Sequence, residues 1–203
     1  MKIICIGRNY IDHAKELDNP VPKEPIFFLK PESTLLIRNR PFFLPDFSNE
    51  IHYEVELVVK IIKLGKNIQE NFAHTYYNEI GIGIDFTARD IQRKCKENGM
   101  PWEISKSFDY SSPLGKFIDK SELKNLNNIN FRLEKNSEIV QKSVSSEMIF
   151  SIDKIIEYVS KFMTLKIGDL IYTGTPAGVG TVSIGDRLEA YIEDKKLLSF
   201  WVK

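Results

Sequence analysis

The apolar residues of the chain are concentrated in short segments that have the composition of β-strands. These segments are rich in Ile, Val, Phe and Tyr and are bounded by turn-forming residues, as expected of strands in a sheet. They cover residues 2–6, 26–29, 51–62, 79–86, 129–142, 169–174 and 187–202. Hairpin turns are predicted at residues 134–138 and at Asp194-Lys195, so we expect a mainly antiparallel or mixed sheet.

Helices are the minority in this chain. The clearest begins at Ser151, a good N-cap residue, and its apolar residues recur with helical spacing. They are Ile152, Ile155, Ile156, Val159, Phe162 and Met163. A second helix is predicted from Thr87 to Gly99, with Thr87 as its N-cap and Asp90 three residues later. Strand hairpins interrupted by a few helices predict an α+β fold, mainly β, with residues 1–203 in a single domain.

Composition argues against several classes of protein. The chain has 203 residues, of which 42% are hydrophobic, enough to form its own core. Its 28 basic residues balance 28 acidic ones, whereas dominant nucleic-acid binding requires a basic surface. No apolar run approaches the roughly 18 residues of a membrane span, and the first strand ends too early for a signal peptide. The two cysteines, Cys5 and Cys95, cannot form a disulfide framework, so we expect a cytoplasmic protein. From the charge balance and the short apolar runs, we expect neither a nucleic-acid nor a membrane partner.

Two glutamates alternate with apolar residues in the segment 51–62. Because successive side chains of a strand point to opposite faces, Glu54 and Glu56 share one face with His52. Two carboxylates this close repel each other unless they are solvated, protonated or neutralised by a cation. An exposed outer face of a sheet and a cation site are therefore both open at this point.

The segment 79–86 places Gly81, Gly83 and Asp85 on the face opposite to three isoleucines. Glycines beside an acid clear space for a ligand or for another segment of the chain. An ordinary acid at a strand end, or a cap for the following helix, is the alternative. If Asp85 converges with Glu54 and Glu56, the three acids offer hard oxygen ligands suited to Mg²⁺, Mn²⁺ or Ca²⁺.

Other candidate residues also have an ordinary alternative. His13 and Glu16 lie three residues apart on one face of a short helix, where a carboxylate can orient an imidazole that activates water; such a pair is also common on surfaces. The glycine-rich segment 173–180 can bind an anion through backbone amides or serve as a structural turn. Lys106 and Arg8 are candidate cations for a substrate, with ordinary solvated surface residues as the alternative.

Four separated motifs together resemble those of the fumarylacetoacetate hydrolase family over almost the whole chain. In order, they are Gly7-Arg8-Asn9-Tyr10-x-x-His13, Glu54-x-Glu56, Asp85-Phe86-Thr87-Ala88-Arg89-Asp90 and the segment from Gly168-Asp169 to Gly180. Two further stretches are similar to the short single-domain branch of acylpyruvate hydrolases and oxaloacetate decarboxylases. These are Pro101-Trp102-x-x-x-Lys106-Ser107-Phe108 and Ser146-x-Met148-Ile149-Phe150-Ser151-Ile152.

This resemblance implies a mixed β-sandwich or roll of the family's C-terminal domain type, usually dimeric, so a homodimer is expected. It also implies that a Mg²⁺ or Mn²⁺ ion is held by Glu54, Glu56 and Asp85. The remaining roles that it implies are a catalytic dyad of His13 and Glu16, an active-site lysine at Lys106, and substrate-binding residues Arg8, Gln92 and Thr175.

The expected function is a divalent-metal-dependent reaction of a small 2-oxo acid. Such an acid can chelate the metal through its carboxylate and keto oxygens, so that electrons arriving at C3 delocalise into a metal-bound enolate. Acylpyruvate hydrolysis, oxaloacetate decarboxylation and keto-enol tautomerisation share that intermediate. The alternatives are an isomerase or decarboxylase of 2-hydroxymuconate-type dienoic diacids, and a non-catalytic metal-binding β protein. Mg²⁺ and Mn²⁺ both stay open, because they accept the same oxygen donors.

Overall fold

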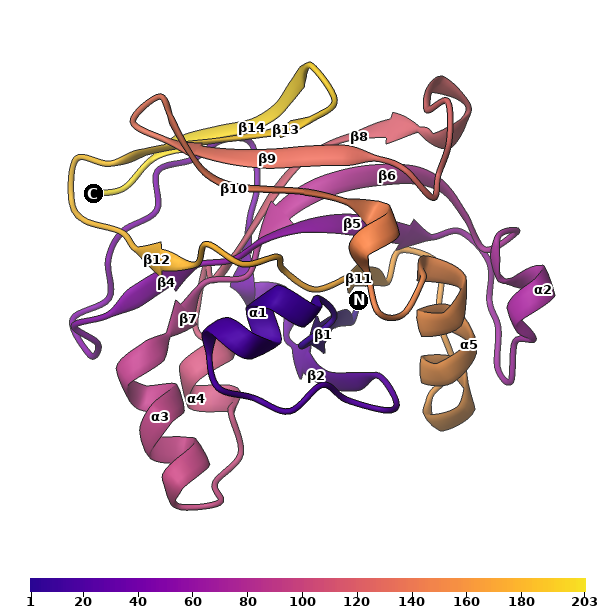
Figure 1. Cartoon of the computed structure of the whole chain (residues 1–203), viewed down its shortest axis with the longest axis horizontal. Coiled ribbons are helices and arrows are strands. Elements are labelled where there is room, and N and C mark those ends of the chain that lie inside the picture. Colours follow the sequence, from indigo (N-terminus) through magenta and orange to yellow (C-terminus); the bar gives the residue numbers. More distant parts are fainter.

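The computed structural model describes all 203 residues, and strands make up most of its regular structure (Figure 1). The strands are β1 (Ile3–Gly7), β2 (Ile26–Lys30), β3 (Leu35–Leu36), β4 (Ile51–Tyr53), β5 (Val55–Ile61), β6 (Tyr77–Ile84), β7 (Thr87–Ala88), β8 (Ser112–Asp119), β9 (Asn130–Lys135), β10 (Glu138–Val144), β11 (Leu170–Tyr172), β12 (Gly180–Thr181), β13 (Arg187–Ile192) and β14 (Lys195–Trp201). The helices are α1 (Ile11–Glu16), α2 (Glu70–Ala73), α3 (Arg89–Glu97), α4 (Glu103–Lys106) and α5 (Ile152–Phe162).

The strands form three sheets of mixed direction. The largest has seven strands in the order β2-β1-β11-β5-β6-β8-β3. Within it, β1 pairs with β11 and β3 with β8 in parallel, and the other neighbours are antiparallel. A four-stranded sheet, β10-β9-β13-β14, and a three-stranded one, β12-β4-β7, complete the fold. This arrangement confirms the predicted mainly β, α+β fold.

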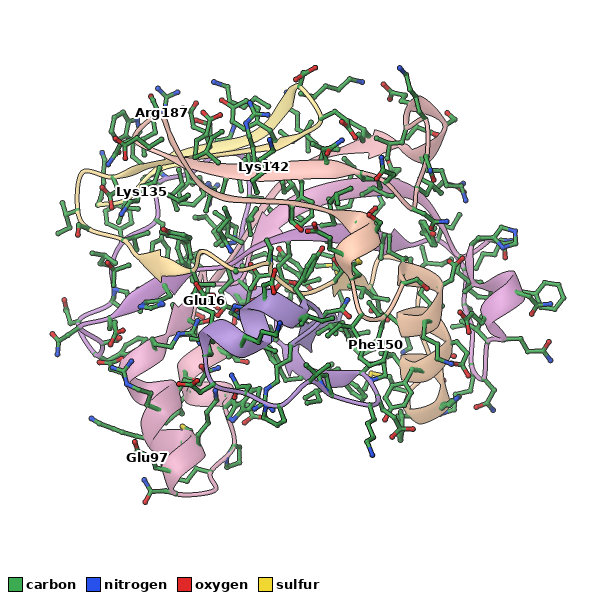
Figure 2. The ribbon with its side chains drawn as sticks, in the orientation of Figure 1. Glu16, Glu97, Lys135, Lys142, Phe150 and Arg187 are labelled. Carbon is green, nitrogen blue, oxygen red and sulfur yellow. The ribbon has the colours of Figure 1, made fainter.

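The four-stranded sheet packs across β5, β6 and β8 of the seven-stranded sheet (Figure 1). One cluster of 37 buried apolar residues lies between the two sheets and extends to Ala73 of α2 and Ile155 of α5. Figure 2 draws the side chains on the ribbon. Ile80, Ile82 and Ile84 from β6 meet Leu188 and Ala190 from β13 in this cluster. Burial of this apolar surface stabilises one side of the β5–β6 pair. The opposite side of β5 carries Glu56 and also Val58, which belongs to a second, smaller apolar cluster with residues of β1 and β11.

The segment 51–62, predicted as one strand, is divided at Glu54. Residues Ile51–Tyr53 (β4) pair within the three-stranded sheet, whereas Val55–Ile61 (β5) pair within the seven-stranded one. The predicted alternation nevertheless holds, because Tyr53, Val55 and Leu57 belong to the core cluster and the two glutamates do not. Glu54 therefore lies at the corner where the chain passes from one sheet to the other.

Two details of the predicted helices are wrong and one is confirmed. Thr87 is not an N-cap: it pairs in the short strand β7, and α3 begins at Arg89 without a side-chain cap. Phe162 is 59% exposed and does not join the buried stripe of α5. Ser151 does cap α5, since its hydroxyl accepts the backbone N–H of Lys154.

Strand β8 and helices α2 and α4 are absent from the elements predicted above. Pro113 and Gly115 lower the strand propensity of β8. Helices α2 and α4 have four residues each, too few to show a helical period in the sequence. None of the helices is long and apolar enough to cross a membrane.

Gly83 lies on the same face of β6 as Asp85, and the space beside it is filled by Tyr172 from β11. A Cβ atom at Gly83 would lie 2.6 Å from the Tyr172 ring and 2.9 Å from the Pro113 carbonyl oxygen. We therefore expect Gly83→Ala to lower the free energy of unfolding by about 1–3 kcal/mol, measured by urea denaturation. Gly7→Ala is the matched control, because a Cβ atom there meets nothing closer than 3.9 Å. Equal losses in the two variants would contradict this steric explanation.

Candidate metal centre

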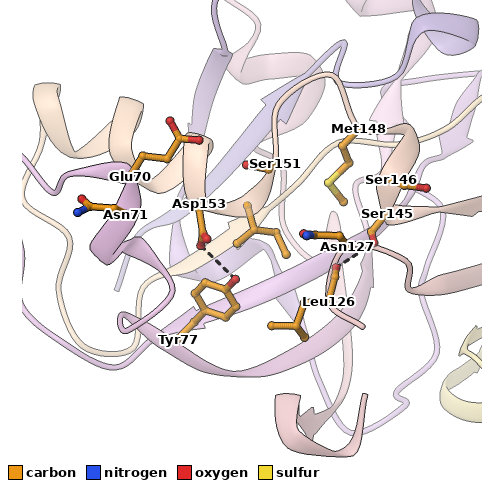
Figure 3. A pocket seen from close by; sticks show the side chains of 11 residues that line it. Glu70, Asn71, Tyr77, Leu126, Asn127, Ser145, Ser146, Met148, Ser151 and Asp153 are labelled. Atoms are coloured by element: carbon orange, nitrogen blue, oxygen red, sulfur yellow. Dashed lines mark hydrogen bonds between the residues drawn. The ribbon is translucent and has the colours of Figure 1, made fainter. Parts of the chain in front are cut away.

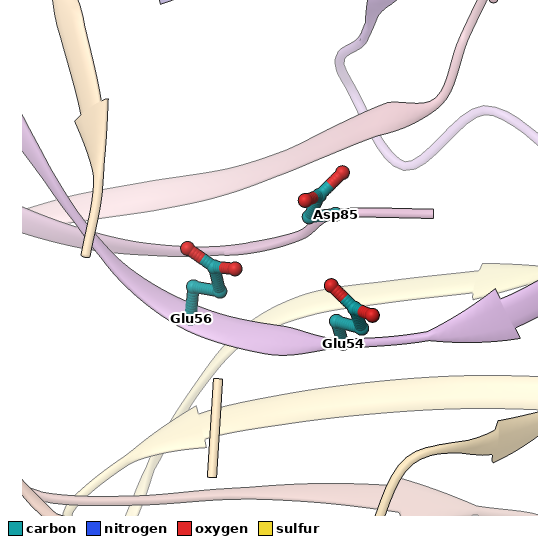
Figure 4. Close-up of side chains that lie close together, drawn as sticks. All are labelled: Glu54, Glu56 and Asp85. Atoms are coloured by element: carbon teal, nitrogen blue, oxygen red, sulfur yellow. The ribbon is translucent and has the colours of Figure 1, made fainter. Parts of the chain in front are cut away.

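Three acidic side chains from adjacent strands converge on one point (Figure 4). Glu54 lies at the corner before β5, Glu56 lies on β5, and Asp85 follows the last residue of β6. One carboxylate oxygen of each lies within 4.8 Å of those of the other two, and no residue of the three is more than 5% exposed. An exposed outer sheet face is therefore excluded. Asp85 is not a cap for α3 either, since that helix has no side-chain cap.

Basic side chains neutralise two of the three acids. Lys106 Nζ lies 2.7 Å from Glu54 Oε2 and 2.7 Å from Asp85 Oδ2. Lys30 Nζ lies 2.5 Å from Asp85 Oδ1, and Arg89 forms an ion pair with Glu54. Burial alone would raise the pKa of Glu54, but Lys106 and Arg89 outweigh burial and hold that pKa well below its ordinary value. Lys106 is 3% exposed, so it is not a solvated surface lysine.

Glu56 is the acid of this cluster without a cationic partner. Its Oε2 accepts a hydrogen bond of 2.7 Å from the Gly174 N–H. Burial, together with repulsion from Asp85 and Glu54, raises the pKa of Glu56 well above its ordinary value. A charged carboxylate is costly in such a place, and a divalent cation between the three acids would offset the repulsion. The residues therefore fit a divalent metal ion with oxygen ligands.

His13 and Glu16 form a hydrogen-bonded pair beside the acidic cluster. Both lie on α1, and His13 Nδ1 is 3.0 Å from Glu16 Oε2. Glu16 Oε1 also accepts the Gly178 N–H at 2.9 Å. Burial would raise the pKa of Glu16, but the hydrogen bonds from His13 and Gly178 outweigh burial and lower it. His13 is only 6% exposed, so this is not a surface pair. Because Nδ1 is engaged, Nε2 is the ring nitrogen left for proton transfer.

A small cavity brings the candidate site residues together. Its lining includes Arg8, His13, Glu54, Glu56, Asp85, Gln92, Lys106 and Thr175. Glu16 does not line the cavity but contacts it through His13. The volume is about 40 Å³, room for a metal ion and few water molecules, so side chains of the lining must shift to admit a larger ligand.

A larger hollow of about 790 Å³ lies elsewhere, between α2, α5 and residues 145–148 (Figure 3). Tyr77 and Asp153 meet in it through a hydrogen bond of 3.1 Å. None of the site residues predicted from the sequence lines it.

The three candidate substrate-binding residues reach the small cavity from different segments. Arg8 follows β1 in the left-handed conformation, with φ of 58°, a strained geometry that is concentrated at ligand sites. Gln92 on α3 accepts a hydrogen bond of 2.5 Å from Arg89 through Oε1, which leaves its N–H groups for a ligand. Thr175 lies in the loop after β11 and is 3% exposed. The glycine-rich segment therefore contributes a side chain as well as the Gly174 amide.

Several residues that contact this site are absent from the predicted set, among them Arg89, Lys30 and Gln141. Arg89 falls within the third sequence motif, so the resemblance to the family could have identified it as a site residue. Lys30 at the end of β2 and Gln141 on β10 lie outside all the motifs, and a lone lysine or glutamine in a strand has no distinguishing pattern. Only the tertiary structure places Lys30 on Asp85 and Gln141 on Thr175.

Comparison with known proteins agrees with this geometry. The family model described as Fumarylacetoacetate (FAA) hydrolase C-terminal matches residues 2–200. The chain belongs to the fumarylacetoacetate hydrolase family. The fold and the buried acidic cluster described above are thus those of a fumarylacetoacetate hydrolase family protein.

Two relatives and one solved structure in the fumarylacetoacetate hydrolase family are similar over nearly the whole chain. Mitochondrial oxaloacetate tautomerase FAHD1 from Mus musculus is 42% identical over 201 residues, which cover 99% of this chain and 91% of the mouse protein. Mitochondrial oxaloacetate decarboxylase from Dictyostelium discoideum is 43% identical over 192 residues, covering 94% and 88% of the two chains. Fumarylpyruvate hydrolase from Pseudomonas aeruginosa, solved in complex with Mn²⁺ and pyruvate, superposes with a TM-score of 0.93 at 34% identity and covers 100% of this chain and 89% of that one.

Proposed function

We propose that this protein is a divalent-metal-dependent enzyme that acts on small 2-oxo acids. The observation that carries the proposal is the buried cavity in which three carboxylates, a lysine and His13 meet, with Glu16 hydrogen-bonded to His13 behind it. Two relatives are named for reactions of oxaloacetate, and the Pseudomonas aeruginosa enzyme is named for hydrolysis of fumarylpyruvate. The proposed reactions are acylpyruvate hydrolysis and decarboxylation or tautomerisation of oxaloacetate.

Glu54, Glu56 and Asp85 would hold the metal ion, and their oxygen ligands suit Mg²⁺ or Mn²⁺. When bound, the ion supplies Lewis-acid polarisation of the substrate's keto and carboxylate oxygens. The Mn²⁺ in the Pseudomonas aeruginosa complex supports a divalent ion of this class.

The charge of the cavity lining favours an anionic substrate. Besides the three acids, the lining includes four cationic side chains, Arg8, Arg89, Lys96 and Lys106. With a divalent cation bound, the lining carries a net positive charge, which suits a 2-oxo acid with one or two carboxylates. Burial, followed by repulsion from Arg8 and Arg89, lowers the pKa of Lys96. A bound anion would offset the repulsion among these cations.

In acylpyruvate hydrolysis, His13 Nε2 takes a proton from a water molecule as the water oxygen attacks the distal acyl carbonyl. Glu16 holds the ring in place and stabilises the imidazolium. Lys106 donates to the carbonyl oxygen as negative charge develops on it. Cleavage of the C–C bond releases the carboxylic acid, and His13 returns the proton to C3 of the remaining fragment, which leaves as pyruvate. The substrate carboxylate is held by Arg8, Gln92 and Thr175.

An NMR assay of the purified protein tests this function. Oxaloacetate, acetylpyruvate and a 2-hydroxymuconate-type dienoic diacid are each incubated with Mg²⁺, Mn²⁺ or a chelator. Loss of each substrate, pyruvate formation and keto-enol exchange are followed over time. We expect chelator-sensitive turnover, and the fastest reaction identifies a hydrolase, a decarboxylase or a tautomerase. No turnover, with a metal-dependent rise in melting temperature, would support a non-catalytic metal-binding protein instead. Turnover of a dienoic diacid alone would support an isomerase.

We also propose a cytoplasmic homodimer in which residues 1–203 form a single catalytic domain. The core cluster that draws on both large sheets supports a single domain. The two buried, unpaired cysteines, Cys5 and Cys95, support a reducing compartment. Light scattering of the purified protein measures the number of chains in the assembly.

A further inference from the structure

Gln141 is a buried polar residue that connects the four-stranded sheet with the metal centre. It lies on β10 and is 1% exposed. The pairing of β10 with β9 shifts register between Ile139 and Gln141, which marks a β-bulge at Val140. A bulge re-aims the side chains beside it. Here Gln141 is directed toward β5 and the loop that carries Thr175.

The Gln141 amide makes three hydrogen bonds that fix its orientation. Oε1 accepts the Val55 N–H at 2.9 Å. Nε2 donates to Thr175 Oγ1 at 2.9 Å and to the Pro176 carbonyl oxygen at 2.9 Å. The reverse orientation is excluded, because it would set an amide N–H against the Val55 N–H and a carbonyl oxygen against the Pro176 carbonyl oxygen.

This orientation decides how the Thr175 hydroxyl can meet a ligand. A hydroxyl group has one proton to donate and two lone pairs that accept. Because Thr175 Oγ1 accepts from Gln141 and makes no other hydrogen bond within the protein, its proton is free for an acceptor in the cavity that Thr175 lines. We propose, on the basis of the function proposed above, that Gln141 is a positioning residue that keeps the Thr175 hydroxyl as a hydrogen-bond donor to the substrate carboxylate.

The same bulge also supports the His–Glu pair. Gly178 packs so closely against it that a Cβ atom would lie 2.4 Å from the Val140 carbonyl oxygen. The φ of Gly178 is 99°, a conformation that glycine adopts readily. The Gly178 N–H donates to Glu16 Oε1. The bulge therefore fixes the loop that carries both the hydroxyl donor and the amide that holds the orienting carboxylate.

Pyruvate binding to the Mn²⁺-loaded protein tests the role of Gln141 without relying on turnover. Calorimetric titration compares the wild type with Gln141→Met, Thr175→Val and the double variant. Gln141→Met has a similar length but lacks the N–H donors. We expect each single variant to bind pyruvate about 10-fold more weakly, since a hydrogen bond to a charged group is lost. We expect the double variant to bind no more weakly than Thr175→Val, because both changes remove the same interaction. The Mn²⁺ affinity should stay at the wild-type value in all of them.

If the losses of pyruvate affinity in the two single variants add up in the double variant, the proposal is overturned, because Gln141 would then affect binding by a route other than Thr175. If Gln141→Met does not fold, as judged by its melting temperature, Gln141→Glu replaces it in the cycle with the same expectation. Gln141→Glu keeps the acceptor for the Val55 N–H but turns the Thr175 hydroxyl into a donor to residue 141. A wild type that binds no pyruvate would contradict the proposed function, and this inference with it. Normal wild-type binding with unaffected single variants would contradict only the role of Gln141.

Discussion

Glu56→Gln is expected to bind Mg²⁺ or Mn²⁺ at least about 100-fold more weakly than the wild type. Removing a residue that only hydrogen-bonds to a metal ligand already lowers metal affinity by about 10–100-fold, and Glu56 is a proposed ligand itself. The same change should leave the metal-free protein as stable as the wild type or more stable. Burial and repulsion from Asp85 and Glu54 raise the pKa of Glu56, and a neutral glutamine removes that repulsion. It can still accept the hydrogen bond from the Gly174 N–H.

Calorimetric titration with Mn²⁺, and thermal denaturation with and without the metal, measure the two effects. Glu189→Gln is the matched control, because Glu189 is also a strand glutamate, 7% exposed, but lies on β13 in an ion pair with Lys196. This control should keep the stabilisation by metal, which is about 2.7 kcal/mol at a metal concentration of 100 times Kd. Wild-type Mn²⁺ affinity in Glu56→Gln would remove Glu56 from the proposed ligand set.

His13→Ala is expected to lower kcat for acylpyruvate hydrolysis by about 10²–10⁴-fold, the usual contribution of a general base, while the metal affinity stays nearly unchanged. His13 lines the cavity and makes its hydrogen bond to Glu16, outside the acidic cluster. Decarboxylation of oxaloacetate needs no attacking water. The ratio of the two activities in the variant therefore reports how far His13 serves to activate water.

Steady-state kinetics with acetylpyruvate, together with Mn²⁺ titration, measure these effects. His74→Ala is the control, because His74 is an exposed histidine at the end of α2 and should leave both quantities unchanged. Glu16→Gln keeps an acceptor for the Gly178 N–H but removes the charge that stabilises the imidazolium, so its kcat should fall between those of the wild type and His13→Ala. Loss of metal binding in His13→Ala would contradict the assignment of His13 as a general base that takes no part in holding the metal.

The two central strands were predictable because their side-chain period is local. Alternation in a strand depends only on backbone geometry, so the two glutamates of the segment 51–62, and Asp85 with its glycines in the segment 79–86, were placed on common faces from spacing alone. The interruption at Glu54 was not predictable in this way. It arises because β4 and β5 pair with different sheets, and a pairing partner is not encoded in the segment itself.

The ordinary alternatives for the site residues differ from the observed arrangement chiefly in burial. The spacing of His13 and Glu16 is also found in surface pairs. The sequence around Lys106 is equally compatible with a lysine exposed to solvent. The structure decides between these possibilities, because it encloses His13 and Lys106 in one cavity with the three acids. The resemblance of four ordered motifs to one family anticipated that grouping, which no single motif could do.

Local composition and side-chain period are enough to predict the mainly β, α+β class, the faces of the central strands and the residue types available for chemistry. The tertiary structure alone decided which acids are neutralised, which acid lacks a cation, and how the Thr175 hydroxyl is oriented. Lys30 lies 55 residues from Asp85 in sequence and Gln141 lies 86 residues from Val55. Charge compensation and hydrogen-bond direction depend on such distant partners, because electrostatic and hydrogen-bonding energies act between neighbours in space, whatever their separation along the chain.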